Sequence, residues 1–143
     1  MSLDLERIRA EYDHCFGCGR ANPLGLQLDD FRIDGSTVSV DWTPRPDYQG
    51  FDGILHGGIV AAALDEAMAW AAMLTHDVFV FTGTLDFRYA SQAPLDSRYR
   101  IEASVLERRG RRLRIESKLT IEGEARPVAS ARGLFVVAEG VGG

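Results

Sequence analysis

The chain has 143 residues, of which 45% are hydrophobic and 26% are charged, and its formal net charge at pH 7 is -5. A chain of this length fits one domain, and folding buries roughly two thirds of the surface that the unfolded chain exposes. The negative charge is opposite in sign to that of a nucleic-acid-binding protein, so we exclude nucleic acid as the main partner.

Hydropathy and the start of the chain bear on its location. We find no apolar run that approaches the roughly 20 residues needed to span a bilayer. The first residues are acidic and lack the basic-then-apolar pattern of a signal peptide. We therefore expect a cytoplasmic protein with no membrane partner.

The first part of the chain predicts one short helix and two antiparallel strands. Apolar residues at spacings of three and four predict an amphipathic helix over residues 3–13, and a turn-rich segment follows over residues 17–25. Alternating apolar and polar residues predict strands over residues 26–33 and 37–42, and a loop follows over residues 47–56.

One long helix is predicted, from about Gly57 to about Thr75. Its large apolar residues are not confined to a narrow stripe, and alanines fill most of the remaining positions. A helix that is apolar nearly all round is enclosed, yet one sheet in so short a chain cannot cover every side. We therefore expect a curved sheet that wraps the helix or a second subunit that covers the remainder, and at least a dimer.

The rest of the chain reads as a series of strands. They are predicted over residues 78–81, 84–89, 98–108, 111–121 and 128–137. Two strands, one long helix and several meandering strands give an α+β fold, in which one antiparallel sheet packs on one helix.

The start of the long helix carries a motif. His56-Gly57-Gly58 opens the helix, and Asp65 follows nine residues after the histidine. A long helix with this motif in an antiparallel sheet resembles the hotdog-fold acyl-CoA thioesterases, particularly the phenylacetic-acid-degradation type. Cys15-Phe-Gly-Cys18-Gly19 and Asn22-Pro-Leu-Gly-Leu26 are similar to the N-terminal signature of one branch of that family.

The resemblance covers roughly residues 14–137 and has implications for the whole chain. It implies a single hotdog domain over residues 1–143, with an antiparallel sheet wrapped around one long central helix and an N-terminal arm over about residues 1–25. It implies hydrolysis of a small or medium acyl- or aryl-CoA, with coenzyme A as part of the substrate and no other cofactor or metal. It also implies a homodimer or homotetramer in which the acid of one subunit works with the helix N-terminus of another.

The glycines suit an oxyanion site. Backbone N–H groups at a helix N-terminus are unsatisfied and lie at the positive end of the helix dipole, where they stabilise the oxyanion that forms when a thioester is attacked. The resemblance indicates Gly57 as the oxyanion donor, with Gly58 beside it in contact with substrate. The alternative, that the two glycines only make a tight turn, stays open.

Two adjacent carboxylates lie within the helix. Asp65 and Glu66 point about 100° apart, so they cannot face the same point, and the pattern alone does not choose between them. The resemblance assigns the catalytic role, as nucleophile or general base, to Asp65, and leaves Glu66 as a neighbour that supports the site or contacts substrate. Either carboxylate could instead pair with an arginine across a subunit boundary.

Three further residues are candidates for supporting roles. The resemblance places Gln49 where it orients the water or the thioester, and Thr82 near a hydroxyl that positions water, although a strand threonine also reflects plain β-propensity. His56 precedes a helix N-terminus, where an imidazolium is disfavoured. We therefore expect His56 to shape the site rather than to act as the base.

Two other features of the sequence can each be interpreted as functional or as purely structural. Cys15 and Cys18, with His14, could begin a zinc site, but the sequence offers no second ligand cluster, so we interpret them as small buried thiols in a tight turn. Redox sensing requires exposed, acidic thiols. The basic stretch from Arg108 to Arg112 is a hairpin tip that is either solvated or attracts the phosphates of coenzyme A.

Two other functions are compatible with the sequence. One is a non-catalytic module that binds acyl-CoA or an aromatic ligand on the same scaffold. The other is a hotdog dehydratase, which we disfavour because no separate histidine and acid are suited to hydration chemistry.

Overall fold

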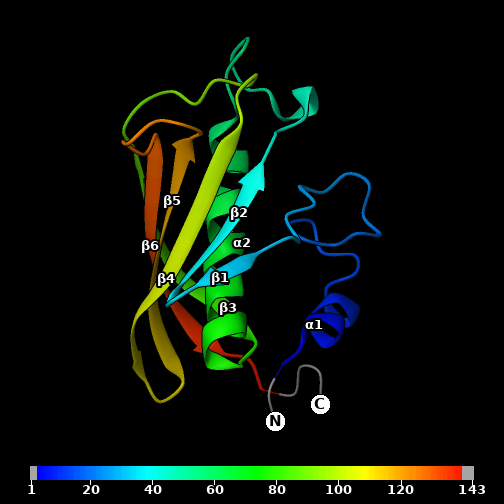
Figure 1. The fold of residues 1–143 in the computed structure, drawn as a ribbon, viewed down its shortest axis with the longest axis vertical. Helices are drawn as coiled ribbons and strands as arrows, with labels where there is room; N and C mark the ends of the chain where they lie inside the picture. The colour runs from blue at the N-terminus through cyan, green and yellow to red at the C-terminus, as the bar shows by residue number, and fades with distance from the viewer. Residues whose placement is uncertain (1–2, 140–143) are drawn as a thin grey trace.

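The computed structural model describes residues 3–139, which form one antiparallel sheet, one long helix and a short N-terminal helix (Figure 1). In chain order the elements are α1 (Leu5–Glu11), β1 (Arg32–Asp34), β2 (Thr37–Trp42), the 3-10 helix η1 (Pro46–Tyr48), α2 (Gly57–His76), β3 (Val80–Tyr89), β4 (Tyr99–Arg109), β5 (Arg112–Ile121) and β6 (Ala129–Val137). The predicted α+β arrangement is therefore confirmed.

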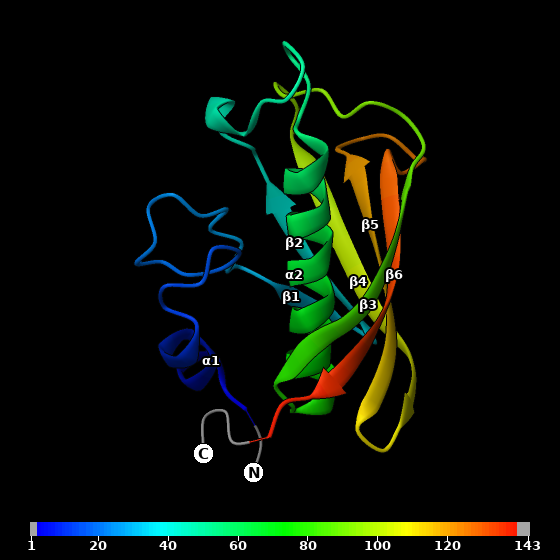
Figure 2. The ribbon, with the colours of Figure 1, turned by 180° about the vertical axis from the view of Figure 1, so that it is seen from behind.

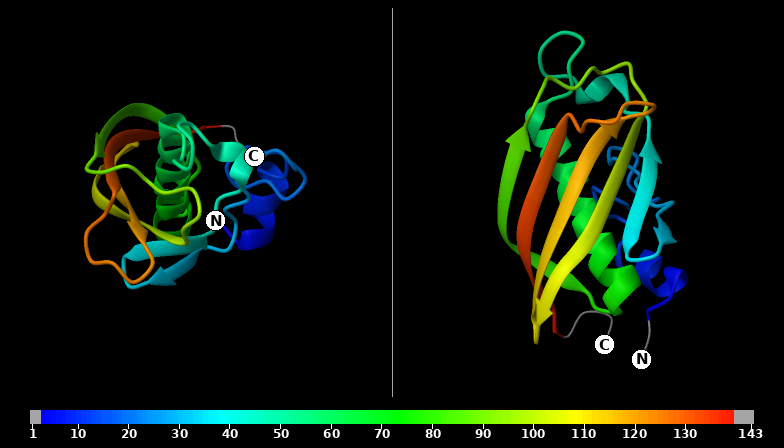
Figure 3. Two further views of the ribbon diagram at one scale, coloured as in Figure 1. Left: turned by 90° about the horizontal axis from the view of Figure 1, so that it is seen from above. Right: turned by 60° about the vertical axis from the view of Figure 1, so that its left-hand side comes forward.

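The sheet has the strand order β1-β2-β4-β5-β6-β3, and every neighbouring pair is antiparallel. Because α2 connects β2 to β3, the strand that follows the helix reaches the far edge of the sheet and pairs with the last strand. The sheet curves around α2, as the view from above shows (Figure 3). The predicted curvature is thus observed, and β1 and β3 are the two edge strands.

Helix α2 begins and ends at residues whose conformations explain its bounds. His56 is the extended N-cap residue, and its ring nitrogen Nδ1 accepts a hydrogen bond from the Gly58 N–H at 2.9 Å. Asp77, in the left-handed conformation at φ 54°, ends the helix and donates its N–H to the Met73 carbonyl. The predicted start at Gly57 is confirmed, and the helix ends one residue later than predicted, at His76.

The length and composition of α2 correct one expectation. The helix has 20 residues and is apolar enough to cross a bilayer, because its many alanines add to the apolar content. The expectation that no segment has these properties is therefore wrong. In the fold, α2 packs against β2, β3, β4, β5 and β6, as the core helix of the domain does.

Two strand predictions also differ from the structure. Of the predicted strand over residues 26–33, only the end belongs to β1, because Gln27 adopts a left-handed φ of 58° and the N–H groups of Leu26 and Leu28 bond to the carbonyls of Phe16 and Gly17. The predicted strands over residues 78–81 and 84–89 are one strand, β3, with a register shift between Thr82 and Thr84. The glycine between these threonines led us to predict a break where the strand has a bulge.

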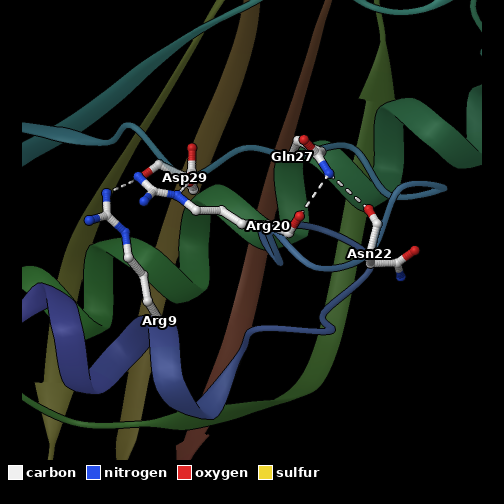
Figure 4. Close-up of polar contacts among 5 residues, drawn as sticks. All are labelled: Arg9, Arg20, Asn22, Gln27 and Asp29. Carbon is white, nitrogen blue, oxygen red and sulfur yellow. Dashed lines mark hydrogen bonds and ion pairs between the residues drawn. The ribbon is translucent and has the colours of Figure 1, made fainter.

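The segment between α1 and β1, which we call the arm loop (residues 12–31), lies across α2 from the sheet (Figures 1, 2 and 3). Its backbone is held by its own polar side chains (Figure 4). The Gln27 side-chain amide donates to the Asn22 carbonyl at 2.9 Å, and Arg20 forms an ion pair with Asp29. Arg9 of α1 donates to the Asp29 carbonyl at 3.5 Å, which ties the loop to the short helix.

Candidate functional site

The first two N–H groups of α2 differ in their hydrogen bonds. The Gly58 N–H donates to Nδ1 of His56, whereas the Gly57 N–H donates to no partner within residues 3–139. The Gly57 carbonyl accepts a hydrogen bond from the Tyr89 hydroxyl at 2.7 Å, which fixes the first turn of the helix against β3. The Gly57 N–H is therefore the group at the helix start that remains available to a ligand.

A cleft opens beside this N–H. Its volume is about 370 Å³, and Phe51, Ile54, Leu55, Gly57, Val60 and Tyr89 are among the residues that line it. Most of these side chains are apolar or aromatic. The start of α2 thus offers an apolar cleft with a hydrogen-bond donor at its wall, which is the usual composition of a small-molecule site.

Asp65 is the second candidate group and lies half-buried in the middle of α2. The Thr82 hydroxyl, on the neighbouring strand β3, donates to its Oδ1 at 2.8 Å. Burial raises the pKa of Asp65 above its ordinary value, and the Thr82 hydrogen bond opposes that rise in pKa. Asp65 is therefore a stronger base than an exposed carboxylate, held in one orientation by Thr82.

Asp65 and the Gly57 N–H cannot act on the same carbonyl group within one chain. They are eight residues apart on one helix, which corresponds to about 12 Å along the helix axis. Within one chain the two candidate groups are therefore separated by about two turns of helix.

The surface around Asp65 is unusual for a core helix. Ala61, Ala62, Asp65 and Ala69 form a half-buried stripe on α2, and the adjacent β3 segment from Phe81 to Thr84 is exposed. Since β3 is an edge strand, its outer backbone groups have no partner strand in the sheet. The stripe and the edge together form a face of small side chains and unpaired strand backbone that a second polypeptide can approach closely.

Glu66 faces a different part of the molecule. Its side chain is only 9% exposed, and its Oε1 lies 3.2 Å from Sγ of Cys15 in the arm loop. Burial raises the pKa of Glu66 to about 8. A hydrogen bond from Cys18 lowers the pKa of Cys15 to about 5. The two adjacent carboxylates of α2 therefore lie in separate environments, one toward β3 and the other beneath the arm loop.

The remaining predicted residues lie as follows. The Gln49 side-chain oxygen accepts a hydrogen bond from the Gly53 N–H at 2.8 Å, so it holds the loop before α2. The His56 ring caps the helix through Nδ1, and its role in shaping the site stays a prediction. At the hairpin tip the arginines are exposed, and Arg109 pairs with Glu107 at 2.7 Å.

The structure thus brings His56, Gly57 and Gly58 together at one point and Asp65 with Thr82 at another. Sequence reasoning missed Tyr89, which bonds to Gly57, and the contact of Glu66 with Cys15. An aromatic residue near the end of a strand gives no signal of such a role, and the contact with Cys15 joins residues 51 positions apart.

The geometry and the sequence together define the class. A profile of the Thioesterase superfamily matches residues 52–128, which is more than half of the chain and includes both α2 and Asp65. The chain therefore belongs to the thioesterase superfamily. A comparison with curated protein sequences gave no match.

Solved structures share the fold. Zebrafish thioesterase superfamily member 2 is 17% identical with a TM-score of 0.75, and the match covers 96% of this chain and 100% of that one. The thioesterase superfamily protein RHA08564 is 24% identical with a TM-score of 0.76 over 82% of this chain, but this chain spans only 60% of that protein. The protein smu.793 from Streptococcus mutans, solved with acetyl-CoA bound, is 15% identical with a TM-score of 0.69, covering 76% of this chain and 89% of that one. At these identities the likeness concerns the fold, which is the hotdog fold.

Proposed function

We propose that the protein is an acyl-CoA thioesterase that hydrolyses a small or medium acyl- or aryl-CoA, of the phenylacetic-acid-degradation type. The observation that carries this proposal is the free Gly57 N–H at the wall of an apolar cleft, on the same helix as a half-buried carboxylate held by Thr82. Membership of the thioesterase superfamily supports it, as does the acetyl-CoA bound to smu.793. The N-terminal motif supports the subtype.

The active unit in this proposal is a homodimer, alone or as half of a homotetramer. A second copy related by a two-fold axis pairs its β3 with the exposed β3 edge and lays its α2 antiparallel against the alanine stripe. Asp65 of one subunit then lies near the start of α2 in the other. This arrangement overcomes the separation of about 12 Å between the two halves of the site in one chain.

The chemistry follows from the roles of the two groups. The Gly57 N–H binds the thioester oxygen and stabilises the negative charge that develops on it. Asp65 either takes a proton from water, which attacks the carbonyl carbon, or attacks directly to give a mixed anhydride that water then hydrolyses. The carbon–sulfur bond breaks, coenzyme A leaves as the thiol after protonation, and the carboxylic acid is released.

The test is hydrolysis of a panel of short, long and aromatic acyl-CoAs, with thiol release as the readout. Protein alone and protein with free coenzyme A serve as blanks, because Cys15 and Cys18 are free thiols. We expect hydrolysis by the native protein and its loss in Asp65→Asn. Binding of acyl-CoA without thiol release would favour the non-catalytic binding module, and equal rates in Asp65→Asn would remove Asp65 from the mechanism.

A further inference from the structure

Beneath the arm loop, three side chains converge that the thioesterase chemistry does not use. Sγ of Cys15, Sγ of Cys18 and a carboxylate oxygen of Glu66 all lie within 4.8 Å of one another. Cys18 is 4% exposed and Glu66 9% exposed, so the cluster is closed from solvent on most sides. The two cysteines come from one tight turn and the carboxylate from the middle of α2.

The backbone of the arm loop brings the two cysteines close to Glu66. The Gly17 N–H donates to Sγ of Cys15 at 3.3 Å, which stabilises negative charge on that sulfur. A Cβ atom at Gly17 would lie 2.4 Å from Cδ of Glu66, so any larger residue there would displace the carboxylate from its present position. A Cβ atom at Gly19 would lie 2.4 Å from the Asp13 carbonyl oxygen, so the turn after Cys18 also requires glycine.

Among the residues that the structure describes, the cluster has no cationic partner. Glu66 forms no ion pair with any residue in the 3–139 range, and its side-chain hydrogen bonds are to the two cysteines. A carboxyl group in mid-helix that is removed from water without a cationic partner is costly. A bound cation would offset that cost and would draw the three groups together.

We propose that Cys15, Cys18 and Glu66 form a binding site for a zinc ion, which fastens the arm loop to the central helix. Two sulfur ligands and one oxygen ligand suit zinc, which accepts both, whereas calcium and magnesium require oxygen ligands. Three protein ligands leave the fourth tetrahedral position to water. Zinc binds both cysteines as thiolates, so any thiol proton still present on them is released to the buffer, and the oxidation states of sulfur and metal stay unchanged.

The site is separate from the proposed catalytic groups. Asp65 is bonded to Thr82 on β3, whereas Glu66 meets the arm loop about 100° further round the helix. The zinc ion therefore holds the arm loop in place and takes no part in the hydrolytic step. Its test does not depend on thioesterase activity.

The first experiment uses the reduced, chelator-treated full-length protein and Co²⁺ as a spectroscopic probe for zinc. We expect one Co²⁺ per chain, a thiolate-to-cobalt charge-transfer band and the visible bands of tetrahedral cobalt, all displaced by one equivalent of Zn²⁺. Zn²⁺ should also slow the reaction of the two thiols with a disulfide reagent. Absence of the charge-transfer band, or thiols that react at the same rate with and without Zn²⁺, overturns the proposal.

Variants then identify the ligands. Cys15→Ser and Cys18→Ser should each lose the charge-transfer intensity of one sulfur. Glu66→Gln should weaken Zn²⁺ binding by more than the roughly 10- to 100-fold that loss of an outer contact costs. Asp65→Asn is the matched control, because it removes the neighbouring carboxylate that does not belong to the cluster, and it should bind Co²⁺ as the native protein does. Far-UV circular dichroism establishes that each variant is folded. Native affinity in a folded Cys15→Ser, Cys18→Ser double variant overturns the site, and native affinity in Glu66→Gln removes the carboxylate from it.

Discussion

The two faces of α2 that carry Asp65 and Glu66 differ more than their adjacent positions suggest. Asp65 lies half-buried beside an exposed strand edge and accepts a hydrogen bond from Thr82. Glu66 is almost fully buried beneath the arm loop, and its contact is a thiol. One step along a helix, about 100°, therefore separates a carboxylate that can reach a substrate from one that is enclosed by the protein's own chain.

The largest expected difference is in kcat/KM, when each of the two carboxylates is replaced by its amide. Asp65→Asn should lower kcat/KM for an acyl-CoA by about 100- to 10,000-fold, since it removes a general base or nucleophile. Glu66→Gln should retain hydrolysis, because Glu66 does not face the cleft at the helix start. Steady-state thiol release measures both variants, and an equal loss in the two would show that the faces are not functionally distinct.

The next largest effect is expected at the start of the helix. Gly57→Pro keeps the first helical position, which accepts proline, but removes the N–H, so kcat should fall by about 100- to 1,000-fold. Gly57→Ala keeps the N–H and is the control, because its Cβ would meet only the Tyr89 ring, at 3.9 Å. Comparable kcat values for the proline and alanine variants would contradict the role of this N–H.

The hydrogen bond from Thr82 predicts a shift in pH dependence. Asp65 acts as a carboxylate, so activity is lost as the pH falls through its pKa, which burial raises and the Thr82 hydrogen bond lowers. Thr82→Val should raise the pKa of Asp65 further and move the acid limb of kcat/KM to higher pH. Thr84→Val on the same strand is the control and should leave the limb unchanged; a shift to lower pH in Thr82→Val would contradict the prediction.

The smallest predicted effect concerns packing on the Glu66 face. Gly17→Ala places a methyl group against Glu66 and should lower the free energy of unfolding by about 1–3 kcal/mol, as overpacked sites do. Urea denaturation of the metal-free protein measures this change, with Gly57→Ala as the unstrained comparison. A Gly17→Ala protein as stable as the native one would mean that the arm loop can move away from α2 at little cost.

Most of the fold could be predicted because local signals agree with it. A histidine followed by two glycines marks the start of α2, and alternating residues mark strands β2, β4, β5 and β6 to within one residue. The prediction over residues 26–33 fails because Leu26 and Leu28 alternate like a strand, while their backbone N–H groups bond to Phe16 and Gly17 within the arm loop itself. Alternation reports which side chains are buried, and it does not report where the backbone hydrogen bonds go.

The candidate site likewise has a part that the sequence predicts and a part that it does not. Gly57, Asp65 and Thr82 could each be selected from the sequence, but only the sheet order shows that Thr82 lies beside Asp65. The environment of Glu66 could not be predicted, because it depends on a turn 51 residues earlier that has no periodic pattern. Contacts made by irregular segments leave no local signal in the sequence.

The position of β3 in the sheet has a consequence for how the chain folds as it is synthesised. In the described part of the chain, residues 80–89 pair within the sheet only with residues 129–137, so β3 has no partner strand until those residues have left the ribosome. Strands β2, β4 and β5 can pair earlier and pack against part of the surface of α2. The nascent chain therefore carries a strand with two unpaired edges until β6 pairs with one of them.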